Sequence, residues 1–511
     1  MTRRCFVSCY CTVFVIFSIC FLFSSQTIPA ITNPHEDSQH IIIFRSTPSA
    51  ELIQNLTSNY KNVGRLISFS ENLHMLPGDF GQDFTERFKD QIELVSASEV
   101  EDKEKSEDGK PWIVVRDEVV RTVDNVVLGK ESEEENDKPE KKRFRTEDSV
   151  YGGAMLQKNV QSWGLDRIDQ RALPLSGTYS YPDSAGNQVD AYIIDTGINL
   201  SHPEFEGRAK WGKTTISSCK VDDDENGHGT FVAGIIGGKT YGVAKKVNLI
   251  AVKSLDVEGM GSIRSVLYGF EYVIQSHKSK GRKAKSVANL SIGTTYNRAV
   301  NLAVNELVSQ GISITVNIIL FYAFSFVTQE LMFLEFLKAA AGNGDELGKG
   351  IDACSVSPAS ARSAITVGSI DPTDVLSEFS NFGECVNLFA PGQKILSSHP
   401  YQSSGTSIRS GTSFACPYVA GVVALLLSES KYAENLRPKD ISTLIQGLAT
   451  KDVIIGLQGT GSPNLLLYNK VDEIVEVIGE GVGVMVNGWY RGTALFVWFL
   501  IVEGIKIALT F

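Results

Sequence analysis

Short apolar segments alternate with helix-like segments through residues 157–470, and this alternation limits the possible folds more than any other feature. The apolar segments are as long as buried strands and cover residues 189–194, 247–252, 287–290 and 364–367. The segments between them have the apolar spacing of helices and cover residues 230–237, 262–276 and 299–310. Such alternation predicts an α/β domain in which a doubly wound, mostly parallel sheet forms the middle of three layers.

A smaller α+β domain is predicted upstream, in residues 31–100. Strand-like segments 40–44 and 64–69 alternate there with helix-like segments 49–60 and 83–94. This pattern is typical of a small unit that precedes the larger domain.

Residues 101–156 are charged and poor in apolar residues, apart from short runs at 112–115 and 119–128. This composition favours a partly disordered linker. Its basic cluster, residues 141–145, is either a processing site or a solvated charge run. We interpret the whole segment as a charged linker with a processing region.

Residues 1–30 have the pattern of a secretory signal peptide. Arg3 and Arg4 precede the apolar run 5–23, and small residues follow it. A signal anchor is the alternative, because this run is long enough to span a bilayer. We therefore expect a protein of the secretory pathway that reaches the extracellular space, the cell wall or the vacuole. The sequence indicates no role for the tail, residues 471–511.

The net charge of the chain is −11, and much of the acidity lies in the linker. This balance excludes a general nucleic-acid-binding surface. We expect a monomer that needs no cofactor and holds no metal ion.

A serine among small residues, Ser413, directly precedes a long apolar run that is typical of a buried helix. Gly411 allows a tight turn before it. A side chain at the start of a helix lies near the positive end of the helix dipole, which favours developing negative charge. This placement suits a nucleophile, although the cap of a buried helix explains the same residues if they are taken alone.

Three further motifs supply the groups that a serine nucleophile needs. Asp195 ends an apolar strand, which is where sites form in α/β sheets. His228 lies between two glycines at the start of a helix, and Asn343 lies in a glycine-rich turn. Each motif alone is compatible with a structural role, but together they predict hydrolysis by an Asp–His–Ser triad. The backbone N–H of Ser413 and the side-chain amide of Asn343 would form the oxyanion hole.

These motifs occur in the order found in subtilisins, and the sequence resembles the proteinase K and cerevisin-like fungal branch of the subtilisin family. The resemblance covers about residues 160–468 and rests on four motifs: Asp195–Gly197, Asn226–Thr230, Ala340–Asn343 and Gly411–Pro417. It implies a subtilisin-like fold and a serine endopeptidase that acts on peptides or proteins. It also implies that residues 31–100 are a propeptide, which chaperones folding, inhibits the enzyme and is then removed by autoprocessing.

By the same resemblance, a substrate peptide binds as an added strand between two segments of the enzyme. The first segment contributes Leu255, Asp256, Gly259 and Gly261. The second contributes Ser291, Ile292 and Gly293.

The resemblance also bears on cysteines and on metal binding. Cys354 and Cys385 match positions that carry cysteine in cerevisin-like chains, which implies that they form a disulfide bond. Asn387 stands where the proteinase K branch has a calcium-binding aspartate. Because calcium prefers anionic oxygen ligands, we expect that site to be weak or absent.

The largest departure from the family pattern is an apolar insert, residues 316–338. It separates the strand-like segment 311–315 from the motif that contains Asn343. A surface helix is one interpretation, but its many phenylalanines would expose a large apolar patch. We hypothesise a retained intron instead, because a valine codon begins with GT, a lysine codon can end with AG, and excision restores the family spacing.

Two other classes of function are weighed against a protease. A catalytically silent subtilase with a structural or binding role in a cell or spore wall is the main alternative, and the insert favours it. A non-proteolytic serine hydrolase is disfavoured, because the usual Gly-x-Ser-x-Gly motif is absent around Ser413.

Overall fold

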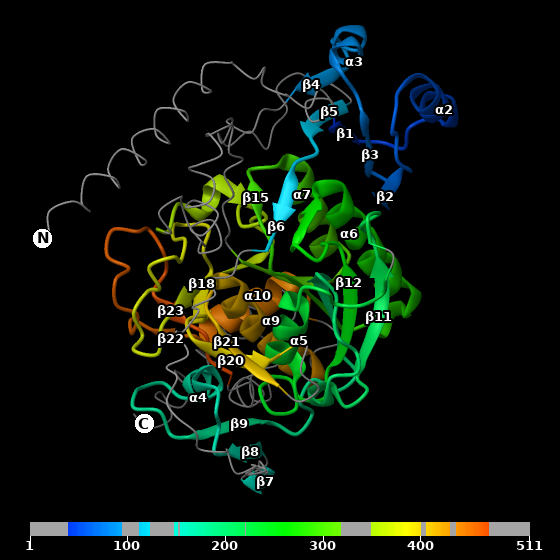
Figure 1. Cartoon of the computed structure of the whole chain (residues 1–511). Helices are drawn as coiled ribbons and strands as arrows, with labels where there is room; N and C mark the ends of the chain where they lie inside the picture. Colours follow the sequence, from blue (N-terminus) through cyan, green and yellow to red (C-terminus); the bar gives the residue numbers. More distant parts are fainter. Residues whose placement is uncertain are drawn as a thin grey trace, which may run out of the picture.

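The computed structural model describes the greater part of both domains (Figure 1). The described residues are 39–94, 112–122, 148–151, 154–219, 221–317, 349–399, 405–429 and 436–469. The predicted signal peptide and tail lie outside these ranges, as do Asn343 and most of the insert. Within the described part, no helix has the length and apolarity that crossing a membrane requires.

A nine-stranded sheet runs through the larger domain, and the prediction of a doubly wound, mostly parallel sheet is confirmed. Every neighbouring pair that involves β10, β12, β14, β16 or β18 is parallel, whereas the last two strands pair antiparallel. The order across the sheet is β11 (Ala209–Thr214), β12 (Asn248–Lys253), β10 (Asp190–Asp195), β14 (Ser286–Leu290), β16 (Ser313–Val316), β18 (Ile365–Ile370), β19 (Leu388–Pro391), β23 (Leu465–Leu466) and β22 (Thr450–Lys451).

Helices cover both faces of this sheet, which explains why its strands are apolar on both sides. Successive side chains of β10 point to opposite faces, so Ile193 belongs to one core and Ile194 to the other. The first core also contains helices α5 (His228–Gly237), α9 (Thr412–Ser428) and α10 (Pro438–Leu448). The second core contains α6 (Ile263–Ser279) and α7 (Arg298–Ser309).

In its described residues, the smaller N-terminal domain consists of a five-stranded sheet and two helices. Its strand order is β2 (Ile67–Ser70), β3 (Leu73–Asp79), β1 (Gln39–Phe44), β5 (Trp112–Arg116) and β4 (Ile92–Leu94), and its helices are α2 (Ala50–Asn59) and α3 (Gln82–Arg87). The helix predicted over 83–94 is therefore too long, because α3 ends at Arg87 and the chain returns as β4. Strand β5 lies within residues 101–156, for which the composition predicts a linker, but its pairing with β1 places it in the small domain.

The small domain packs on the larger one through one face of its sheet. In β1, Ile42 and Phe44 point into the small domain's own core. Ile41 and Ile43 point the other way and share a core with α6 and α7. Figure 1 shows the small domain seated over these two helices, with β6 descending from it into the larger domain. The same alternation of side chains thus builds the small core and the interface.

The remaining elements are short. They are β6 (Val119–Arg121), β7 (Asp148–Tyr151), β8 (Ala154–Lys158), β9 (Thr178–Pro182), β13 (Met260–Ser262), β15 (Thr294–Thr295), β17 (Val356–Ser357), β20 (Ile395–Ser398) and β21 (Thr406–Arg409), with the helices α4 (Trp163–Ile168), η2 (Pro203–Phe205), η3 (Gly281–Lys283) and η4 (Ala353–Ser355). Strands β7, β8 and β9 form a small antiparallel sheet, so part of the predicted linker pairs with the larger domain.

Candidate active site

The end of β10 and the start of α5 bring Asp195 and His228 together. The His228 Nδ1 atom lies 2.7 Å from Asp195 Oδ1 and 2.9 Å from Asp195 Oδ2, and both side chains are fully buried. Burial raises the pKa of Asp195, while the nearby imidazole and the Thr196 N–H oppose this rise. With Nδ1 against the carboxylate, the Nε2 atom of His228 is the one that can exchange a proton with a nucleophile.

The glycines around His228 are required by the local backbone. Gly227 precedes α5 with a φ of 94°, in the left-handed region that favours glycine. Gly229 lies so close to the turn after Asp195 that an added Cβ would come within 2.1 Å of the Gly197 carbonyl oxygen. The Gly-His-Gly sequence therefore lets the helix start touch the strand end.

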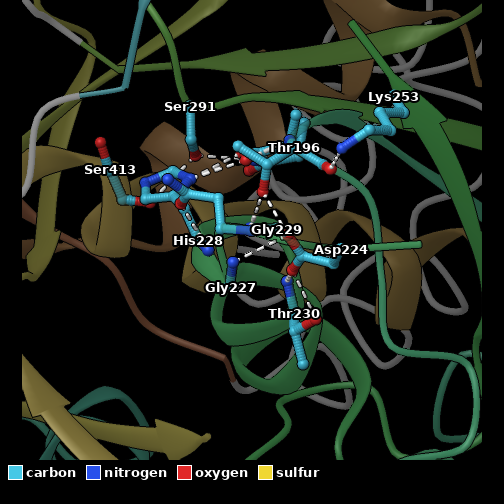
Figure 2. Close-up of polar contacts among 12 residues, drawn as sticks. Thr196, Asp224, Gly227, His228, Gly229, Thr230, Lys253, Ser291 and Ser413 are labelled. Carbon is cyan, nitrogen blue, oxygen red and sulfur yellow. Dashed lines mark hydrogen bonds and ion pairs between the residues drawn. The ribbon is translucent and has the colours of Figure 1, made fainter. Parts of the chain in front are cut away.

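Ser413 lies in the first turn of the buried helix α9. The next residue, Phe414, packs its ring 5.5 Å from the His228 ring and 4.7 Å from the ring of Phe231. This packing of α9 on α5 places Ser413 beside His228 (Figure 2). The three residues of the predicted triad therefore come together from two helix starts and one strand end.

A proline inside α9 explains how the backbone at Ser413 is held. Pro417 has no N–H and cannot donate to the Ser413 carbonyl four residues earlier. The Ser291 hydroxyl donates to that carbonyl instead, at 2.9 Å. Asn289 in turn donates to the Ser291 hydroxyl at 2.8 Å. A residue predicted to bind substrate thus also fixes the backbone of the predicted nucleophile.

Among the described residues, the side-chain amide that contacts the Ser413 hydroxyl belongs to Asn317, which the sequence motifs did not predict. Its Nδ2 atom donates to Ser413 Oγ at 2.9 Å, and the residue is fully buried at the end of β16. Val316, the last residue of β16, pairs with both β14 and β18. Val316 and Asn317 are the first two residues of the insert, whereas the predicted donor Asn343 lies outside the described residues. A polar residue directly after a buried strand was the signal that could have indicated Asn317.

The predicted substrate-binding segments hold part of the chain itself. Strand β6 pairs antiparallel with β13, so that Val120 lies opposite Gly261. On its other side, Arg121 exchanges two backbone hydrogen bonds with Gly293, at 3.3 and 3.5 Å. The Thr122 N–H donates to the Gly259 carbonyl at 3.0 Å. Three glycines predicted to bind a substrate backbone therefore bind the backbone of residues 120–122.

The other predicted substrate-binding residues have different surroundings. The side chains of Leu255 and Ile292 lie in the second core. The Asp256 carboxylate accepts the N–H groups of Glu258 and Met260, at 3.1 and 2.9 Å, and so shapes the turn before β13. These three side chains stabilise the two segments. Only the backbone groups of these residues are therefore available to bind a peptide.

The cysteines and Asn387 occupy distinct environments. Cys354 and Cys385 form a disulfide bond, with their sulfur atoms 2.03 Å apart. Asn387 Oδ1 accepts the Thr366 N–H at 2.7 Å and is therefore engaged with the neighbouring backbone. Cys416 is a buried thiol in α9, and burial raises its pKa to about 12.

A buried Asp–His pair beside a serine at a helix start has the arrangement of a serine hydrolase site. The parallel sheet places the acid at the carboxyl end of a strand, as such sites require.

Comparisons with known proteins identify the family. A model described as the Subtilase family matches residues 186–466. The chain is 39% identical over 325 residues to subtilisin-like protease 2 of Pseudogymnoascus destructans, covering 63% of this chain and 70% of that protein. It is 42% identical over 315 residues to an extracellular serine proteinase of a Thermus species, covering 62% of this chain and 68% of that protein. It is also 42% identical over 315 residues to a cuticle-degrading protease of Metarhizium anisopliae, covering 62% and 72%.

A solved structure gives the same result. The crystal structure of a cold adapted subtilisin-like serine proteinase is 39% identical, with a TM-score of 0.51, and covers 61% of this chain and 99% of that chain. The chain therefore belongs to the Subtilase family and is a serine endopeptidase that acts on proteins. The predicted resemblance to this family is confirmed.

Proposed function

We propose that this protein is a secreted or vacuolar endopeptidase, made as a precursor, that hydrolyses peptide bonds through Asp195, His228 and Ser413. The observation that carries the proposal is the 2.7 Å hydrogen bond between buried Asp195 and His228, next to a serine in the first turn of α9. Secretion is supported by relatives whose names are extracellular serine proteinase and cuticle-degrading protease.

In this mechanism, Ser413 Oγ attacks the carbonyl carbon of the peptide bond while His228 Nε2 takes the hydroxyl proton. Asp195 orients the imidazole and stabilises its protonated form. The tetrahedral intermediate collapses when His228 returns the proton to the leaving amine, the C–N bond breaks and an acyl-enzyme remains. Water then attacks the acyl group by the same proton transfers and restores Ser413.

The oxyanion of the intermediate needs two donors on the other side of Ser413. The Ser413 N–H at the start of α9 is one. Asn343 is the second in a chain that lacks residues 316–338, because excision joins its motif directly to β16. In the full chain, Asn317 is an amide that the described residues place within reach of Ser413. One such amide contributes about 3–4 kcal/mol to transition-state stabilisation.

The small domain acts as a propeptide that inhibits the enzyme and assists its folding. Support comes from residues 120–122, which occupy the predicted substrate strand, and from polar contacts that fasten the domain nearby. Asp117 accepts the Arg264 N–H at 2.9 Å and its Nε at 3.0 Å, at the start of α6. The antiparallel register at Arg121 directs the chain toward Ser291, which contacts Ser413. We therefore expect the first autolytic cut shortly after Thr122.

A second function is favoured by one observation. The insert begins at Val316, inside the sheet and directly before the residue that contacts Ser413. The second candidate, for a chain in which the insert is translated, is a catalytically silent subtilase with a structural or binding role in a cell or spore wall.

Hydrolysis and processing test the proposal together. The full chain, the chain without 316–338, and a Ser413→Ala version of each would be expressed in a secreting host. We expect cleavage of denatured casein by the insert-free chain, a new N-terminus shortly after Thr122, and neither event in its Ser413→Ala version. A folded insert-free chain that is no more active than its Ser413→Ala control would contradict the protease assignment for this site. Activity in the insert-free chain alone would support the silent alternative for the full chain.

A further inference from the structure

Asp224 is a buried carboxylate that the catalytic mechanism does not use. In sequence it lies between β11 and α5, and 4% of its surface is exposed. Five groups donate to it: the hydroxyls of Thr196 (2.7 Å) and Thr230 (2.6 Å) and the N–H groups of Asn226 (3.3 Å), Gly227 (2.8 Å) and Thr230 (2.8 Å). A buried carboxylate with this many donors holds its surroundings in one arrangement.

The donors come from the two places that carry the Asp–His pair. Thr196 follows Asp195 at the end of β10, whereas Gly227 and Thr230 flank His228 at the start of α5. The Thr196 hydroxyl also accepts the Gly229 N–H at 3.0 Å, so the strand end is joined to the helix start twice (Figure 2). Asp195 and His228 are 33 residues apart in sequence. Besides the contact between their side chains, their segments are joined by the Asp224 network and by the Asn199 N–H, which donates to the Thr230 hydroxyl at 2.9 Å.

A buried lysine accompanies these carboxylates. Lys253 is fully buried at the end of β12, and its ammonium group donates to the Thr196 carbonyl at 2.6 Å. The Glu225 carboxylate lies 3.9 Å from the same nitrogen. The ammonium group therefore fixes the backbone of Thr196, the residue whose hydroxyl donates to Asp224.

We propose that Asp224 is a positioning residue for the Asp195–His228 pair, acting through the Thr196 hydroxyl and the start of α5. The proposal rests on the proposed function of that pair. The network sets the separation of a strand end and a helix start, and a shift of about 1 Å at such a place can reduce turnover about 100-fold. Asp224 does not touch the reacting atoms.

The test compares this network with an equivalent one elsewhere. Asp166 is also a buried carboxylate, 3% exposed, that accepts the Ser176 N–H and hydroxyl and the Gly177 N–H, at 2.9, 3.0 and 2.6 Å. Asp166→Asn is therefore the matched control. The test variants are Asp224→Asn and Thr196→Val, and Thr196→Ser keeps the bridging hydroxyl.

Turnover would be measured on processed enzyme and normalised to folded protein. We expect Asp224→Asn and Thr196→Val to lower kcat by about 10- to 100-fold with KM within about twofold, because the pair is displaced while the substrate strand is not. Thr196→Ser should recover most of the loss. Asp166→Asn should lower the melting temperature but not kcat.

A second readout does not depend on turnover. We expect the proton between His228 Nδ1 and Asp195 to give a separate low-field NMR resonance in the folded full chain. This resonance should shift or disappear in Asp224→Asn and Thr196→Val but not in Asp166→Asn. An unchanged kcat in Asp224→Asn, an unchanged resonance, or an equal kcat loss in Asp166→Asn would overturn the proposal. A resonance that responds as expected in a chain that cleaves nothing would support the positioning role and contradict the proposed function instead.

Discussion

On one side of Ser413 lies the Asp195–His228 pair, and on the other lies the amide of Asn317. The acid–base side is made from the end of β10 and the start of α5. These two segments approach so closely that position 229 must be glycine, and Asp224 binds both of them. The proposed oxyanion side lies at the end of β16, where the insert begins. The first side is held by residues that each make several hydrogen bonds. The second side changes with the insert, because the insert determines which residues follow Thr315. A buried Asp–His pair thus lies beside a serine whose other polar neighbour, Asn317, belongs to the insert.

Substitution of the acid tests the first side and should have the largest effect. Asp195→Asn keeps the shape of the side chain but turns a donor toward His228 Nδ1, which favours the wrong tautomer. We expect kcat of the insert-free enzyme to fall about 10,000-fold with little change in KM. Steady-state hydrolysis of a peptide substrate measures it, with Asp166→Asn as the control. A loss below about tenfold would mean that this pair is not the acid–base side.

Substitution of the amide tests the second side and should have the next largest effect. In the insert-free chain, Asn343→Ala should lower kcat by about 100- to 1,000-fold, because one oxyanion donor is removed. In the full chain, any residual activity should depend on Asn317 in the same way. If Asn317→Ala leaves the residual activity of the full chain unchanged, the contact at 2.9 Å from Ser413 does not serve catalysis.

The link between the two sides is the Ser413 backbone, and breaking it should mainly affect stability. Ser291→Ala leaves the Ser413 carbonyl, already deprived of a helix partner by Pro417, without its donor. We expect the free energy of unfolding to fall by about 1–3 kcal/mol, the cost of a buried acceptor without a partner. Urea denaturation measures this. Ser309→Ala, which removes an exposed hydroxyl bonded to the Glu306 carbonyl, is the control and should change little.

The buried thiol of Cys416, which lies in α9 with Ser413, should show the smallest effect, a slow reaction with thiol reagents. Burial raises the pKa of Cys416 from 9.0 to about 12. The group is therefore protonated at pH 8, and any stability it contributes is complete below pH 9 and is lost as the pH rises toward 12. A disulfide-exchange reagent at pH 8 should react with half-buried Cys219 well before Cys416 in the native chain. Reaction of both at the same rate would show that α9 opens readily.

Local motifs account for what the sequence predicted well. The apolar runs of β10, β12 and β14 stand out because both faces of the sheet are covered. Asp195, His228 and Ser413 stand out in the sequence because glycines lie near them, where the backbone segments approach too closely for a side chain. Their proximity in space follows from the order of the strands in the sheet. The alternation of strands and helices predicts the fold class but not this order.

Other features depend on contacts that no local pattern reports. Strand β5 lies in a charged stretch, and only its pairing with β1 gives it a place in a sheet. Asp224 belongs to an acidic run that has the composition of a solvated loop. The residue is nevertheless buried, and groups of Thr196 and Thr230 donate hydrogen bonds to its carboxylate. Asn317 was overlooked because the insert hides the end of β16, and the family motif drew attention to Asn343.

The most direct test of the central claim, that His228 and Asp195 activate Ser413, is covalent labelling by a fluorophosphonate. Processed insert-free enzyme would be labelled, digested and analysed by mass spectrometry, beside folded Ser413→Ala and His228→Ala variants. We expect one adduct on the peptide that contains Ser413, none in Ser413→Ala, and labelling at least about 1,000-fold slower in His228→Ala. An adduct on another serine, or equal labelling in His228→Ala, would contradict the claim.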